Sequence, residues 1–171
     1  MDLMLVRAGE GWRARFGAHR WRCAVGRDGV RRDKREGDGA TPAGRWPLRR
    51  VLYRADRLDP PIAGVGLPVA KIGPDDGWCD DPADARYNRS VLLPYPGRHE
   101  RLWRDDGIYD VVVVLGHNDD PPRPGAGSAV FLHVARPDYA PTEGCVALAL
   151  DNLLTVLREA GPESRVCVET D

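Results

Sequence analysis

Short apolar runs alternate with clusters of glycine, proline and aspartate along most of the chain. Within several runs apolar and polar residues alternate, which is typical of a strand with one buried face. The runs cover residues 3–6, 20–25, 44–53, 90–95, 108–116, 129–134, 145–150 and 165–169. Their number and the turn residues between them predict a mainly β domain.

Two of the runs predict interior strands. The sequence YDVVVVLG at residues 109–116 is apolar at successive positions, which indicates a central strand covered on both faces. The sequence SAVFLHV at residues 128–134 predicts a second interior strand close after it. Between them, HNDDPPRPGAG contains three prolines and two glycines and cannot continue a sheet, so we expect a semi-rigid loop at residues 117–127.

One helix is predicted near the C-terminus. In DNLLTVLREAGP, residues 151–162, Asp151 can cap the start, a leucine stripe follows, and Gly161-Pro162 ends the helix. We expect this helix to pack one face on a sheet. The segment from about residue 55 to 107 is rich in turn formers and too long for a simple connection, and such loops often carry function.

The composition suits one domain spanning residues 1–171, with 42% hydrophobic and 30% charged residues. No run approaches the roughly 18 apolar residues of a membrane helix, and the N-terminal stretch turns arginine-rich before a signal-peptide core could form. We therefore expect a soluble chain with no export signal and no membrane insertion. Residues 1–57 are basic and the remainder acidic. Without a basic helix or zinc-finger spacing, this pattern predicts a mixed solvated surface and no nucleic-acid partner.

The four cysteines form no CxxC pair and no regular spacing, which argues against a zinc knuckle or a disulfide framework. Cys23 and Cys167 lie in strand-like runs, where a free cysteine usually acts as a small buried hydrophobe. Cys145 differs because it follows Thr-Glu-Gly. A nucleophilic cysteine reacts as the thiolate, so it needs a nearby base or cation, together with donors for the oxyanion formed on acyl attack.

The stretch FLHVARPDYAPTEGCVAL, residues 131–148, contains candidates for each of these needs. Gly144 allows a sharp turn that aims the amides of Glu143, Gly144 and Cys145 into one small space. His133, at the end of a predicted strand, is a candidate base. The residue types alone leave open a buried histidine and cysteine that only fill the core.

A metal site is a second alternative. Zinc accepts His, Cys and Asp ligands, but the spacing here fits no recurrent zinc signature, so we expect no metal. A serine hydrolase is less well supported, because the chain has no GxSxG elbow. The candidate metal ligands would be His117, His133, Cys145 and either Asp119 or Asp120.

The pattern LH…TEGCVAL, preceded far upstream by GDGATPAG, resembles the L,D-transpeptidase catalytic domain, the YkuD-like family. The resemblance covers roughly residues 20–169 and implies a β-sandwich of mixed strands with a packed C-terminal helix. The matching positions are Thr41, Pro42, Ala43 and Gly44 for the family's TPxG turn, His133 for its strand-borne histidine, and Thr142, Gly144 and Cys145 for its S/T-H-G-C segment.

The resemblance implies acyl transfer between peptidoglycan stem peptides, with no cofactor. Cys145 would attack a carbonyl next to an L-configured centre of a donor stem and pass the acyl group to the side-chain amine of diaminopimelate. His133 would take the thiol proton and protonate the leaving amine. Water as acceptor would instead give a carboxypeptidase or endopeptidase, and a non-catalytic wall-binding module is a further alternative. The family implies a cell-envelope (periplasmic) location, and we expect a monomer.

Three departures from the family pattern concern the substrate site. Glu143 replaces the histidine before the glycine, and His117 at the end of the neighbouring strand is the candidate substitute. Ala147 replaces an arginine that often follows the cysteine by two places, so Arg136 or Arg86 would have to supply its carboxylate contact. The proline-rich loop between the two central strands could narrow the entrance to the site.

These departures predict a separate branch of the family, resembling the transpeptidases that form 1,3-type cross-links from L-alanine to diaminopimelate. A shorter acyl-donor site would favour that linkage over the 3,3 type. The residues expected to contact substrate are His117, Asn118, Thr142, Glu143, Arg136 and Tyr87.

Overall fold

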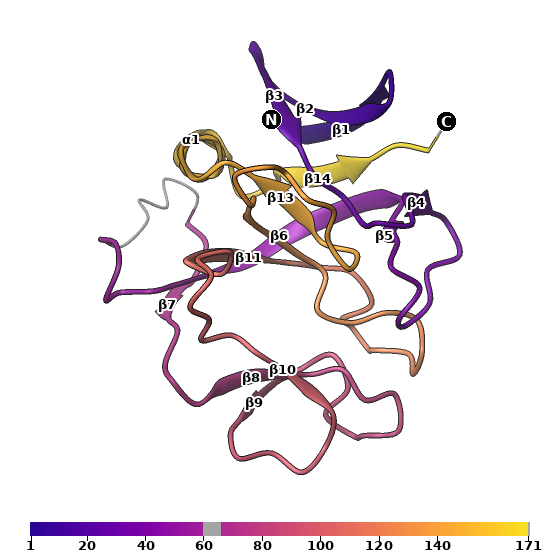
Figure 1. Cartoon of the computed structure of the whole chain (residues 1–171), viewed down its shortest axis with the longest axis vertical. Coiled ribbons are helices and arrows are strands. Elements are labelled where there is room, and N and C mark those ends of the chain that lie inside the picture. The colour runs from indigo at the N-terminus through magenta and orange to yellow at the C-terminus, as the bar shows by residue number, and fades with distance from the viewer. Residues whose placement is uncertain (60–65, 171) are drawn as a thin grey trace.

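The computed structural model describes residues 1–59 and 66–170 (Figure 1). Residues 60–65, part of the turn-rich stretch predicted from about residue 55, lie outside this description. In chain order the elements are β1 (Leu3–Ala8), β2 (Gly11–Phe16), β3 (His19–Cys23), β4 (Val30–Arg31), β5 (Thr41–Pro42), β6 (Gly44–Tyr53), β7 (Val69–Lys71), β8 (Asp76–Cys79), β9 (Ser90–Leu92), β10 (His99–Arg101), β11 (Val111–Leu115), β12 (Phe131–Val134), β13 (Val146–Leu148), α1 (Leu150–Glu159) and β14 (Arg165–Val168).

A nine-stranded mixed sheet forms the main body, in the order β13-β12-β11-β6-β14-β1-β2-β3 with β7 beside β6. Its two ends meet, because Ala24 and Ala147 exchange backbone hydrogen bonds of 3.0 and 2.9 Å just beyond β3 and within β13. The amide of Thr142 also donates to the carbonyl of Val25 at 2.9 Å. The segment that leads into β13 is therefore held on one side by residues 24–27 and on the other by β12.

Strand β11 lies between two hydrophobic cores. Its five residues, Val111–Leu115, are all buried. Val111, Val113 and Leu115 face the larger core, whereas Val112 and Val114 face the second one. This arrangement confirms the prediction of a central strand covered on both faces.

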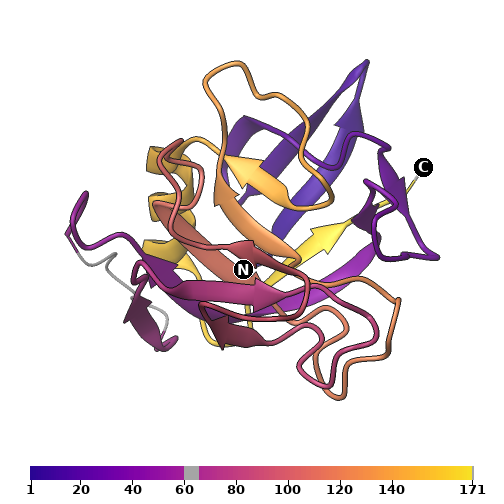
Figure 2. The same cartoon turned by 60° about the horizontal axis from the view of Figure 1, so that its bottom comes forward.

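Helix α1 packs one face into the larger core through Leu153, Val156 and Leu157 (Figure 2). The predicted cap is wrong: the helix begins at Leu150 after Ala149, so Asp151 lies in the first turn, where its charge still favours the helix dipole. The mainly β fold with a packed C-terminal helix is confirmed. In the described part of the chain no helix is long and apolar enough to cross a membrane.

The segment predicted as irregular contains a small sheet in the order β10-β8-β9. This sheet lies across from β11 and β12, below the main sheet in Figure 1. The second core fills the space between the two sheets, with Trp78 from β8 edge-on to Phe131 of β12 at 5.1 Å between ring centroids. Cys145 belongs to this second core. The small sheet therefore covers the face of the main sheet on which Cys145 lies.

The turn around the TPAG sequence is fixed by the fully buried side chain of Thr41 in β5. Its hydroxyl accepts a hydrogen bond from the Gly26 amide at 2.8 Å and donates to the carbonyl of Cys145 at 3.2 Å. One hydroxyl thus joins three segments that are far apart in the sequence.

We predict that Thr41→Val lowers the free energy of unfolding by about 1–3 kcal/mol, because the buried Gly26 amide loses its acceptor. Urea unfolding followed by circular dichroism measures the change. Thr41→Ser is the matched control, since it keeps the hydroxyl. Equal stability of the valine and serine variants would show that this hydroxyl does not stabilise the turn.

Candidate active site

A pocket of about 460 Å³ opens between the carboxyl end of the main sheet's β12, the start of β13 and the small sheet. Cys145 and His133 line it from the main sheet, and Glu100 lines it from β10. Lys34 and Glu36 close it from the loop before the TPAG turn. The pocket therefore brings together residues from four separate parts of the sequence.

Cys145 stands at the end of the turn before β13, with only 9% of its surface exposed. Its thiol donates to the Ala129 carbonyl at 3.2 Å and accepts the Phe131 amide at 3.4 Å. Burial, and secondarily the negative charge of Glu100, raises the pKa of the thiol to about 12, while the ammonium of Lys34 acts weakly in the opposite direction. The resting sulfur is therefore a neutral thiol.

His133 projects from β12, the strand next to β13, into the same pocket. Its Nδ1 lies 3.0 Å from the Val134 carbonyl oxygen. Since a carbonyl can only accept, Nδ1 carries the hydrogen. Burial lowers the pKa of the imidazole to about 4, so the ring is neutral near pH 7 and its Nε2 has a free lone pair. The ring of Tyr109 packs edge-on against it at 5.3 Å.

Two hydrogen bonds of the Thr142 hydroxyl hold the turn from Thr142 to Cys145. Thr142 Oγ1 donates to the Cys145 carbonyl at 2.7 Å and accepts the Gly144 amide at 3.1 Å. Gly144 has φ +135°, and a Cβ there would lie 2.8 Å from the carbonyl oxygen of Ala40, so the position requires glycine. The Gly144 amide is already used within the turn, which corrects the expectation that three successive amides aim into the pocket.

The comparison with family models adds to this geometry. The model of the L,D-transpeptidase catalytic domain, YkuD, matches residues 3–168. The chain belongs to this family. No match was found among curated proteins. The matched region begins at residue 3, earlier than the roughly residue 20 at which the predicted resemblance starts. The additional residues include β1, which pairs with both β14 and β2 and is part of the main sheet.

Lys34 lines the pocket of Cys145 and was not among the site residues predicted from the sequence. Its side chain is 7% exposed, and its Nζ donates to the Asp38 carboxylate and, at 2.8 Å, to the Arg35 carbonyl. A Cβ placed on Gly144 would lie 3.7 Å from this Nζ. An ammonium group has three donors, so one remains to face the turn that carries Cys145. The signal available in the sequence was that Lys34 is one of only two lysines among 25 basic residues.

Two more predicted substrate contacts line the pocket beside Thr142, and both are charged. Arg136 pairs with Asp106 at 3.0 Å. Glu143 has an 82% exposed side chain and pairs with Arg27. At the position where the family usually has a histidine, this chain therefore presents a carboxylate at the pocket rim, turned to solvent.

His117, Asn118 and Tyr87 lie outside the pocket lining. His117 is buried edge-on to Trp46 at 4.7 Å between ring centroids, and its Nδ1 has no hydrogen-bond partner among the described residues. Asn118 closes the proline-rich loop through its side-chain bonds to the backbone of Arg123 and Gly127. A Cβ placed on Gly127 would lie 3.1 Å from Cε1 of His117, so the imidazole packs against the end of the proline-rich loop.

Tyr87 does not line the pocket itself but supports a residue that does. Its hydroxyl donates to Glu36, which lines the pocket, and accepts the Gly127 amide at 3.0 Å. The proline-rich loop does not line the pocket either; the Gly125 carbonyl accepts the amide of Glu36 at 2.9 Å. The loop thus supports the wall of the pocket from outside.

The remaining candidates lie elsewhere. Arg86 lines a separate cavity and donates to the Ser90 carbonyl at 2.8 Å. Asp119, a candidate metal ligand, pairs with Arg49 at 2.8 Å. Over residues 1–59 and 66–170 no group of three or more His, Cys, Asp or Glu side chains is arranged to hold a metal ion.

We predict that the alkylation rate of Cys145 rises about tenfold per pH unit from pH 7 to 10 without a plateau. The reason is that a thiol with a pKa near 12 gains thiolate throughout this range. Iodoacetamide labelling with peptide mapping measures the rate at Cys145 separately from the other cysteines. A plateau beginning near neutral pH would show a resting thiolate–imidazolium pair and contradict the neutral assignment.

Proposed function

We propose that this chain is a cysteine-dependent L,D-transpeptidase that cross-links peptidoglycan stem peptides through a thioacyl-enzyme on Cys145. The observation that carries the proposal is the placement of His133 on β12 and of Cys145 directly before the adjacent strand β13, both lining one pocket, within a domain of the YkuD family. The substrate is a polymer of the cell envelope, so we propose that the enzyme acts there.

Acylation begins from a neutral pair. The thiol of Cys145 exchanges its hydrogen bond to Ala129 for one to Nε2 of His133, which takes the proton as the sulfur attacks the donor carbonyl. A new C–S bond forms and the C–N bond to the next residue of the donor breaks. His133 then gives its proton to the leaving amine, so the ring ends neutral and the acyl group remains on sulfur.

The developing oxyanion has two donors beside the sulfur. The backbone amide of Cys145 makes no hydrogen bond to any described residue, and the ammonium of Lys34 lies next to Gly144. Asp38 fixes this ammonium through its carboxylate. Burial raises the pKa of the Asp38 carboxyl, but the hydrogen bonds from Lys34 and from the amides of Arg35 and Ala40 outweigh it and hold the pKa below its ordinary value. Preorganised donors of this kind lower the barrier because they need not reorient during the reaction.

The charges of the pocket suit a zwitterionic peptide. Arginine side chains of the lining can hold the carboxylates of a stem peptide, and acidic side chains of the same lining can hold the amine of diaminopimelate. The cations of the lining are Lys34, Arg98, Arg104 and Arg136, and its anions are Glu36, Asp80, Glu100 and Glu143. Because Ala147 stands in place of the family's arginine, Arg136 is the proposed carboxylate contact.

We propose 1,3-type linkage, from L-alanine to diaminopimelate, as the main product. The proposal rests on Glu143 and Ala147, which remove two polar groups that the family usually places beside the cysteine. A second candidate is hydrolysis of the same thioacyl-enzyme, which would make the protein an L,D-carboxypeptidase or endopeptidase. It is favoured by the polar lining of the pocket, which admits water.

We predict that Cys145→Ala abolishes cross-link formation from purified muropeptides, and that His133→Ala lowers it by several orders of magnitude. The alanine at position 145 removes the nucleophile, and the alanine at 133 removes the group that takes the thiol proton. Chromatography of the products measures the yield, and circular dichroism checks that each variant is folded. A folded Cys145→Ala variant with unchanged yield would refute the assignment.

We predict that tandem mass spectrometry of the dimeric products locates the new amide between L-alanine and diaminopimelate. Isotopically labelled diaminopimelate in the acceptor distinguishes the two stems. Dimers linked only by 3,3 bonds would contradict the proposed linkage while leaving acyl transfer intact.

A further inference from the structure

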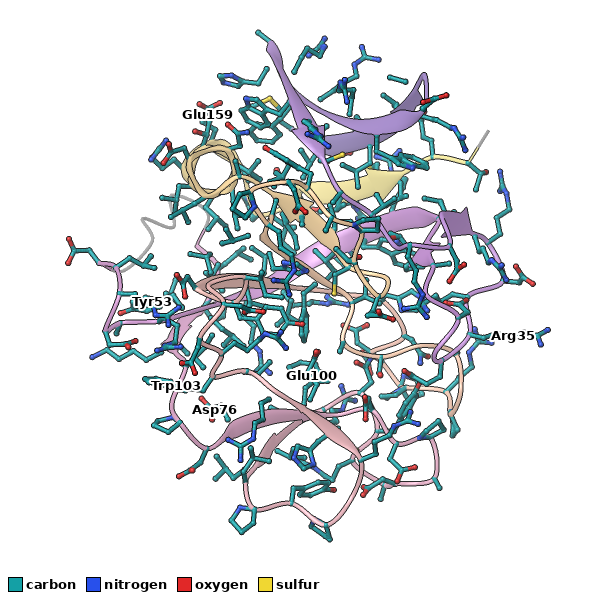
Figure 3. The ribbon with its side chains drawn as sticks, in the orientation of Figure 1. Arg35, Tyr53, Asp76, Glu100, Trp103 and Glu159 are labelled. Atoms are coloured by element: carbon teal, nitrogen blue, oxygen red, sulfur yellow. The ribbon has the colours of Figure 1, made fainter. Side chains whose placement is uncertain are left out.

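Glu100 is the acidic side chain that faces the reacting groups from the small sheet. It projects from β10 into the space between the two sheets, as Figure 3 shows, and lines the pocket with Cys145 and His133. Its Oε2 accepts the Tyr109 hydroxyl at 2.9 Å, and the ring of Tyr109 packs against His133. Its charge is close enough to Cys145 to raise the pKa of the thiol.

An acceptor that enters as an ammonium must lose two protons, and His133 alone can take only one of them. A side-chain amine of ordinary pKa, about 10, enters as an ammonium at pH 7 and must lose two protons to become an amide N–H. One of these protons returns to the sulfur of Cys145 through His133. The other needs a second base, whereas attack by water requires only the proton that goes to sulfur.

We propose that Glu100 is this second base: its carboxylate binds the acceptor ammonium and removes one proton before attack, which favours amine over water as the acceptor. The inference deepens the proposed transpeptidase function and rests on it.

The proposed transfer moves two protons from the acceptor amine. One proton passes from the acceptor nitrogen to a carboxylate oxygen of Glu100, leaving a neutral amine. The amine lone pair forms the C–N bond, the C–S bond breaks, and His133 carries the second amine proton to the departing sulfur of Cys145. Glu100 then releases its proton to solvent through the open pocket, which restores the starting enzyme.

The surroundings of Glu100 suit a group that exchanges protons near neutral pH. Burial raises the pKa of its carboxyl to about 7, opposed by the hydrogen bond from Tyr109 and the charge of Arg104. The carboxylates of Asp80 and Glu36 raise the pKa further. A base with a pKa near the working pH transfers protons most effectively.

The test is the partition of the thioacyl-enzyme between amine and water. With purified muropeptides, Glu100→Gln is expected to lower cross-link formation by at least about 10²-fold while acylation of Cys145 and hydrolysis do not fall. The exposed Glu163→Gln is the matched control and should keep the ratio of the unmodified protein. Glutamine has nearly the same shape as glutamate, so the substitution removes the carboxylate and little else. A normal rate of Cys145 acylation in Glu100→Gln shows that the site of this variant is folded.

The pH profile separates this role from a structural one. In the unmodified protein the ratio of cross-link to hydrolysis should rise as pH increases through about 7, because Glu100 becomes a carboxylate. Tyr109→Phe removes a hydrogen bond that stabilises the carboxylate, so the rise should shift to higher pH. In Glu100→Gln this rise should disappear.

The outcomes distinguish the two levels of the proposal. Normal acylation with an unchanged partition and pH profile in Glu100→Gln would overturn the role of Glu100 and leave transpeptidation standing. Failure of the unmodified protein to form any acyl adduct on Cys145 would overturn the proposed function itself, and the role of Glu100 with it.

Discussion

The carbonyl oxygen of Cys145 accepts hydrogen bonds from the hydroxyls of Thr41 at 3.2 Å and Thr142 at 2.7 Å. These bonds attach the TPAG turn to the turn that carries the sulfur, and the carbonyl of Ala40 packs against Gly144 at the same place. The loop before the TPAG turn also carries Lys34 to the pocket. The two motifs of the family are therefore one structural unit, and the position of Cys145 depends on both.

Burial sets the chemistry of this unit. The same desolvation raises the pKa of Cys145 to about 12 and lowers that of His133 to about 4, so both groups are neutral at rest. Because the Cys145 thiol and the His133 imidazole are both neutral, the sulfur reacts slowly with other electrophiles. The thiolate and imidazolium form only when a substrate carbonyl is in place. The price is a barrier to charge separation, and the proposed donors at Lys34 and the Cys145 amide are placed to lower it.

Local patterns predicted β11 and helix α1, because each depends on residues close in sequence. The pairing of His133 with Cys145 in one site came from the family resemblance, since the residue types alone left a core-filling role open. Lys34 and Glu100 were missed, since long irregular loops bring them to the pocket and no local pattern encodes that return. The direction of His117 was also beyond local reasoning: it depends on how residues 117–127 fold back through Asn118. The predicted cap lay two positions too late: Ala149 is the N-cap, it offers no side-chain cap, and the helix begins at Leu150.

The most direct test of Cys145 as the nucleophile is a rapid-quench experiment with a purified donor muropeptide, followed by intact-protein mass spectrometry and peptide mapping. We expect the protein to gain the mass of the donor's acyl portion within the first turnover, on the peptide that contains Cys145. Turnover without such an adduct, or an adduct on Cys23, Cys79 or Cys167 in its place, would contradict this role of Cys145.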